Sequence, residues 1–203
     1  VTCAAVDAGF SPAIVSAIAK YHLTELFRGV VNHALDVHGG RGIQLGPKNY
    51  LASAYVGVPV AITVEGANIL TRNLIIFGQG LVRCHPYLLK EMEAVQCLDA
   101  RTGLKEFDKI LLKHMRYTLN NLVRSLFFGL THNVLTRTPI KGVAAVYVKD
   151  LTRMSSALAL TADVALLVLG GDLKRKENLS ARLGDVLSYL YMASTVLYTF
   201  EHS

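Results

Sequence analysis

One carboxylate, Glu65, stands in an apolar stretch and is followed at once by Gly66. Its apolar neighbours offer nothing that stabilises a negative charge: Val58, Val60, Ala61, Ile62 and Val64. If this loop is buried, desolvation favours the neutral acid and strengthens the carboxylate as a general base. Gly66 leaves room for a ligand to approach closely. A second interpretation stays open, in which Glu65 stabilises a helix that starts near Ile69.

A glycine cluster, residues 38–42, is the second candidate for chemistry. Neither the dinucleotide fingerprint nor the phosphate-binding loop can be placed on its spacing. Two interpretations remain. The glycines end a helix through a left-handed turn, or they give a cofactor access to the backbone.

The remaining polar residues predict neither a metal site nor a hydrolase. None of the seven histidines has the spacing of a known metal-ligand motif, and the serine pairs have no nucleophile elbow around them. Asp163 lies near an apolar stripe, and we expect it to be paired, for example with an arginine on a facing helix. We therefore predict no metal.

Length and composition describe the scaffold that must position these residues. The chain has 203 residues, of which 52% are hydrophobic and 18% charged, enough for one substantial domain or two small ones. It begins without methionine or a signal peptide, so we expect a piece of a longer protein. The longest apolar stretch, 157–171, is too short to span a bilayer, and no transmembrane helix is predicted.

Charge and cysteine content limit the cellular locations and the binding partners that we expect. Cys3, Cys84 and Cys97 form no close pair, which favours a reducing cytoplasm. The net charge is +6, but the basic residues are scattered and no aromatic residues interleave them, so no nucleic-acid partner is predicted. The only basic run, 174–176, is interpreted as a solvated turn, with contact to phosphate or lipid headgroups left open.

Periodicity predicts an all-α fold built from antiparallel helical bundles. The pattern gives a long helix after Ser11-Pro12 that ends at Gly39-Gly40. Short helices are predicted over 49–57, before Val58-Pro59, over 69–80, where Gly78 and Gly80 stop the helix, and over 84–95. Three further helices begin near 104, 151 and 179, and Gly170-Gly171 ends the second of them. We predict a domain over 1–96, a linker over 97–103 and an additional helical bundle over 104–203.

Three motifs, at 16–21, 34–40 and 64–68, together resemble the C-terminal helical domain of acyl-CoA dehydrogenases. The longer run 57–72, with 76–80 and 83–86, is similar to the large bacterial fatty-acyl-CoA dehydrogenases of beta-oxidation. Residues 169–176 and 180–185 resemble the extra helical region of that branch, so the resemblance covers nearly the whole chain.

The resemblance implies an FAD flavoprotein of lipid metabolism whose helical N-terminal and strand-rich domains lie outside this chain. Glu65 would remove the alpha proton of a fatty acyl-CoA, and the backbone amide of Glu65, next to Gly66, would hold the thioester carbonyl. Gly39 and Gly40, with Asp36 and Ala67, would contact FAD, commonly that of a neighbouring subunit.

Further partners follow from the same resemblance. It implies a homo-oligomer, with electron-transfer flavoprotein as the acceptor. Peripheral contact with the inner face of the bacterial membrane is expected instead from the excess of basic side chains in residues 104–203. Four positions depart from the family pattern: Asp36 and Ile69 replace glutamine, Ala67 replaces threonine and Val64 replaces tyrosine. The rival interpretation is a non-catalytic helical module for oligomerisation or membrane docking.

Overall fold

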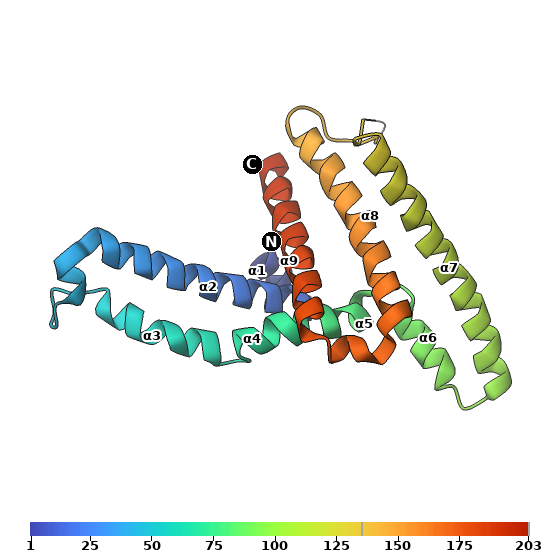
Figure 1. Cartoon of the computed structure of the whole chain (residues 1–203), viewed down its shortest axis with the longest axis horizontal. Coiled ribbons are helices and arrows are strands. Elements are labelled where there is room, and N and C mark those ends of the chain that lie inside the picture. Colours follow the sequence, from blue (N-terminus) through green and yellow to red (C-terminus); the bar gives the residue numbers. More distant parts are fainter. Residues whose placement is uncertain (135, 203) are drawn as a thin grey trace. The chain divides into compact units, whose positions relative to one another are not determined.

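The computed structural model describes residues 1–134 and 136–202, and these residues form helices and turns without a strand (Figure 1). The all-α prediction is therefore confirmed. The elements in order are α1 (Thr2–Asp7), α2 (Ala13–His38), η1 (Gly39–Ile43), α3 (Ala52–Thr63), α4 (Asn68–Leu70), η2 (Thr71–Gln79), α5 (Gly80–Cys84), α6 (Leu88–Val95), α7 (Ala100–Leu130), α8 (Ala144–Leu169), η3 (Gly170–Lys174) and α9 (Glu177–His202).

The chain divides into two compact units, Val1–Ile75 and Ile76–Ser203. In the first unit, α2 and α3 lie side by side and antiparallel (Figure 1). Its buried apolar side chains include Ile14, Ile18 and Val31 of α2 and Val58 of α3. This helical pair places the η1 turn at one end and the Glu65 loop at the other.

The second unit is built on α7, α8 and α9 (Figure 1). Its core consists of six buried side chains: Phe77, Leu81, Ala162, Ala165, Leu173 and Leu183. Gly170 ends α8 with a φ of 49°, a left-handed value that glycine adopts without steric cost. The predicted helix end at this glycine pair is confirmed.

Two predicted helix boundaries are wrong. Pro59 lies inside α3, which continues to Thr63, because its neighbour Val58 is 3% exposed and packs into the core. Gly78 and Gly80 do not end the next helix, since helical structure continues from Asn68 to Cys84 and both glycines are buried. In both places tertiary packing overrides the local preference of proline or glycine.

The predicted linker is shorter than expected. The side chain of Asp99 accepts a hydrogen bond from the backbone N–H of Arg101 (3.2 Å) and caps α7, so residues 100–103 are helical. The two compact units divide between Ile75 and Ile76, whereas the assignment of domains to 1–96 and 104–203 stays a prediction.

One helical stretch, Ala144–Lys174, is long and apolar enough to cross a membrane by length and composition, with a mean hydropathy of 1.7 in its most apolar window. Ala162, Asp163 and Ala165 of this stretch are buried within the second unit. Only 22% of that window is buried, so burial does not explain its apolar composition, and the absence of a transmembrane helix stays a prediction.

Candidate active site

The loop that carries Glu65 joins α3 to α4 and has an unusual backbone. Glu65 has a φ of 55° and Gly66 a φ of 90°. A residue with a β-carbon pays about 1–2 kcal/mol in the left-handed region, and glycine pays much less. Glu65 is therefore held in a conformation that surrounding contacts must stabilise, and such residues cluster at functional sites.

Lys20 supplies those contacts from α2. Its Nζ donates hydrogen bonds to the carbonyl oxygens of Ile62 (3.3 Å) and Gly66 (2.8 Å) and to Oδ1 of Asn68 (2.7 Å). Ile62 precedes Glu65, whereas Gly66 and Asn68 follow it. One ammonium group thus ties together the end of α3, the loop and the start of α4.

Asn68 is the second anchor of the loop and is only 3% exposed. Its Nδ2 donates to Thr24 Oγ1 and to Glu25 Oε1, both at 2.8 Å. The Thr24 hydroxyl in turn donates to the backbone carbonyl of Lys20 (2.8 Å). Every polar atom of the Asn68 side chain therefore has a partner on α2, which fixes the start of α4.

The Glu65 side chain is exposed and has no hydrogen-bond or ion-pair partner among the described residues. The burial on which its predicted strength as a base depends is therefore not present within this chain alone. Its surroundings are apolar but uncovered, since Val64, Ile69 and Leu70 are 47%, 72% and 47% exposed. A carboxylate in an exposed apolar patch is typical of a surface that another domain or ligand covers.

The predicted cofactor residues lie at the other end of the α2–α3 pair. Gly39 has a φ of 55° and a ψ of −131°, a combination open to glycine alone, so the fold itself requires glycine there. Gly40 has an ordinary φ, and a β-carbon built on it would meet no atom within 4 Å. The fold therefore leaves room beside Gly40 for an external group.

Asp36 lines a pocket of about 550 Å³ between the end of α2, η1 and the start of α3. Asn49 shapes this pocket, because its Nδ2 donates to the carbonyl oxygens of Gly42 (2.7 Å) and Gln44 (2.9 Å). Gly39 and Gly40 do not line this pocket, but they follow Asp36 at the end of α2 and the start of η1, so the three residues belong to one turn.

Ala67, by contrast, belongs to the Glu65 loop, where it is half-buried and precedes α4. Gly39 lies about four helical turns beyond Thr24 along α2, which is roughly 22 Å. The predicted site residues therefore fall into two separate groups. One group, at the η1 turn, consists of Asp36, Gly39 and Gly40, and the other, at the Glu65 loop, consists of Glu65, Gly66 and Ala67. The roles predicted for these residues stay predictions.

A buried polar cluster occupies the second unit. Asp163 Oδ1 lies 2.9 Å from Nε2 of His85 and 3.3 Å from Nε2 of His114, and Thr118 donates to Oδ2 (2.7 Å). On its other side, His114 places Nδ1 2.7 Å from Glu91 Oε1. Asp163 is paired, as predicted, but with two histidines rather than with an arginine.

The ligand atoms of His85, His114 and Asp163 lie within 4.8 Å of one another, close enough to surround one metal ion. However, Nδ1 of His85 accepts the backbone N–H groups of Tyr87 (3.3 Å) and Leu88 (3.1 Å). An accepting Nδ1 carries no proton, so Nε2 carries it and donates to Asp163 instead of offering a lone pair. We interpret the cluster as a hydrogen-bonded network, and the absence of a metal stays a prediction.

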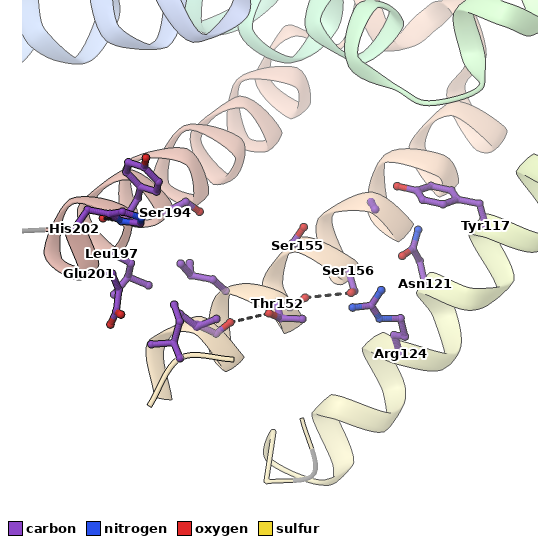
Figure 2. A pocket seen from close by; sticks show the side chains of 15 residues that line it. Tyr117, Asn121, Arg124, Thr152, Ser155, Ser156, Ser194, Leu197, Glu201 and His202 are labelled. Atoms are coloured by element: carbon purple, nitrogen blue, oxygen red, sulfur yellow. Dashed lines mark hydrogen bonds between the residues drawn. The ribbon is translucent and has the colours of Figure 1, made fainter. Parts of the chain in front are cut away.

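A further pocket of about 560 Å³ lies between α7, α8 and α9 (Figure 2). The hydroxyls of Thr152 and Ser156 on its α8 wall donate to carbonyls of their own helix. Asn121 Nδ2 is buried without a partner among the described residues, and Arg124 lies over the Phe128 ring at 5.5 Å. The carboxylate in its lining belongs to Glu201, an exposed residue near the end of α9.

Sequence reasoning predicted a role for Glu65, which stays a prediction, but missed the residues that hold its loop. Lys20 belongs to a motif used for the resemblance, yet nothing local indicated that its ammonium reaches residues 42 to 48 positions away. His85, His114 and Glu91 were missed for the same reason. The sequence offered one indication of such contacts, which was a charged residue on an otherwise apolar helix face.

Two family models match the chain. The model described as "Acyl-CoA dehydrogenase, C-terminal domain" matches residues 2–78, and the model described as "Acyl-CoA dehydrogenase, C-terminal, bacterial type" matches residues 82–203. Together they cover nearly every residue. No solved structure matches the chain.

Proposed function

Because the chain belongs to the acyl-CoA dehydrogenase family, we propose that it is the C-terminal part of an FAD-dependent enzyme that introduces the alpha-beta double bond into fatty acyl-CoA. Glu65 is the base that removes the alpha proton. The observation that carries the proposal is the Glu65 loop, which presents an unpaired carboxylate from a left-handed residue within an exposed apolar patch.

The loop geometry supports two actions of Glu65. Its side chain is free of partners within the described chain and is available to accept a proton. Covering the apolar patch would exclude water from the carboxylate and strengthen it as a base. The neighbouring backbone, held open by Gly66, leaves the amide of Glu65 free to donate to the thioester carbonyl, which stabilises the developing enolate.

FAD supplies the acceptor for the beta hydride. On this chain, the turn at Gly39 and Gly40 would contact the adenine end of the cofactor, as the family resemblance implies. The open space at Gly40 and the nearby pocket at Asp36 are compatible with that contact. Ala67 lies on the Glu65 loop and would contact the flavin end. A homo-oligomer, in which the turn contacts the FAD of a neighbouring subunit, is part of the proposal through the family resemblance.

The test is Glu65→Gln in the full-length protein. The amide keeps the size and shape of the side chain but accepts no proton at neutral pH. We expect acyl-CoA oxidation to fall by about two to four orders of magnitude. FAD content, measured by absorbance, should stay unchanged.

Glu93→Gln is the matched control, since Glu93 is an exposed glutamate on α6. That variant should retain parent activity. If Glu65→Gln oxidised acyl-CoA within a factor of a few of the parent, Glu65 would not be the base.

An interaction role is the second candidate, favoured by the apolar residues exposed along α7. Leu112, Met115, Leu119 and Val123 are each at least 57% exposed. Such a face suits oligomerisation or docking to another domain. This interaction role is compatible with catalysis by the first unit. The proposal also includes electron-transfer flavoprotein as the electron acceptor. It further includes a cytoplasmic location with contact to the inner face of the membrane.

A further inference from the structure

We propose that Lys20 is the positioning residue of the active-site loop, setting the left-handed conformation of Glu65 without touching the substrate. The inference rests on the proposed function of Glu65. It assigns a role to a residue 45 positions earlier in the chain that the sequence placed only within a motif.

The donors of Lys20 are fully used. An ammonium group has three N–H bonds, and Lys20 Nζ has three oxygen acceptors, on Ile62, Gly66 and Asn68. No donor is left for the Glu65 carboxylate. Lys20 therefore acts on Glu65 through the backbone of the loop and not through an ion pair.

The acceptors lie on both sides of Glu65. The Ile62 carbonyl belongs to the last turn of α3, where backbone carbonyls have no helical partner and a positive charge is favourable. The Gly66 carbonyl also accepts from the Thr71 hydroxyl (3.4 Å). With the chain fixed before and after Glu65, the short segment between these points is restricted to few backbone conformations.

Asn68 also restrains the loop, at the start of α4. Its Oδ1 accepts from Lys20 while its Nδ2 is held by Thr24 and Glu25, so the side chain bridges two turns of α2. Loss of Lys20 leaves this anchor in place but releases the Ile62 and Gly66 carbonyls. The strained Glu65 backbone then relaxes toward ordinary angles, which redirects its side chain and its amide.

The test uses the full-length enzyme with Lys20→Met, which keeps the length of the side chain and removes all three donors. Misplacement of a catalytic group by about 1 Å costs roughly a hundredfold in rate. We expect kcat to fall about 10- to 100-fold, while KM for acyl-CoA changes less than about threefold and FAD stays bound. Hydrogen exchange of the amides of Thr63 and Val64, which are hydrogen-bonded in the last turn of α3, should accelerate at least about tenfold.

Two further variants separate geometry from charge and from general damage. Lys20→Arg keeps the charge, but its planar donors match converging acceptors poorly, so it should restore less than half of the lost kcat. Lys90→Met, at an exposed lysine of α6, should match the parent in every measurement. If Lys20→Met is insoluble, Lys20→Gln replaces it, because its shorter amide has two donors instead of three. This variant should show the same pattern.

The outcomes are distinct from those that test Glu65. Unchanged exchange and kcat in Lys20→Met, or full recovery with Lys20→Arg, would overturn the positioning role. Faster exchange in Lys20→Met together with an active Glu65→Gln variant would keep Lys20 as the loop anchor and reject Glu65 as the base. A KM rise without a kcat change would likewise contradict positioning of the base.

Discussion

At the scale of single residues, Asp163 has the most strongly defined electrostatic surroundings. Burial acts to raise the pKa of its carboxyl, but hydrogen bonds from His85, Thr118 and His114 outweigh burial and hold the pKa below the ordinary value of 3.8. A carboxyl whose pKa is lower in the folded state stabilises that state above the unfolded value. This stabilisation is lost as the pH falls below about 3.8 and through the lowered folded pKa.

Asp163→Asn should therefore destabilise the chain at neutral pH, by about 3 kcal/mol or more, since it leaves a buried network short of its charge. The difference in the free energy of unfolding between parent and variant should shrink on acidification below pH 4. Urea unfolding across this pH range measures it. Asp172→Asn, at an exposed aspartate, is the control, and an Asp163→Asn effect that did not change with pH would contradict this account.

At the scale of helices, α6 and α7 approach closely because Gly103 lacks a β-carbon. A β-carbon at this position would lie 2.7 Å from the Ala94 carbonyl oxygen and 3.0 Å from Cβ of Cys97. Gly103→Ala should therefore force the helices apart and cost about 1–3 kcal/mol of stability. Thermal unfolding of the variant measures this cost.

Gly129→Ala is the matched control in the same helix, since its β-carbon meets no atom within 4 Å. Alanine favours helix over glycine by up to about 1 kcal/mol, so this variant should be unchanged or slightly more stable. If the two variants had equal stability, the contact between α6 and α7 would not depend on Gly103.

At the scale of the whole molecule, the proposed function assigns a base to these 203 residues but no oxidant. The family resemblance implies that the flavin site also uses a strand-rich domain, and the described residues contain no strand. We expect the isolated chain to be helical, to bind FAD weakly and to show no dehydrogenase turnover. Its exposed apolar side chains should promote self-association.

Titration with FAD followed by flavin fluorescence tests the first expectation, and size-exclusion chromatography over a range of concentrations tests the last. Circular dichroism establishes that the chain is helical under the same conditions. Tight, stoichiometric FAD binding with reduction by added acyl-CoA would show that this chain contains the complete site.

The sequence by itself determined the features that local chemistry controls. Helical periodicity predicted the all-α fold and the long helices, and Gly170 ended α8 where a left-handed residue was needed. The apolar run around Glu65 and the glycine turn identified the family, because these motifs are short and contiguous. The wrong helix ends at Pro59 and Gly78 have the same origin, because the sequence pattern does not show how these residues pack.

Only the tertiary structure decided which distant residues meet. His85 and Asp163 are 78 positions apart, and Lys20 and Asn68 are 48 apart, yet both pairs are within hydrogen-bond distance. Such pairs depend on how helices pack, and a local pattern carries no information about a partner on another helix. The sequence alone was therefore enough to propose Glu65 as a base, whereas the contacts of Lys20 with the Glu65 loop required the tertiary structure.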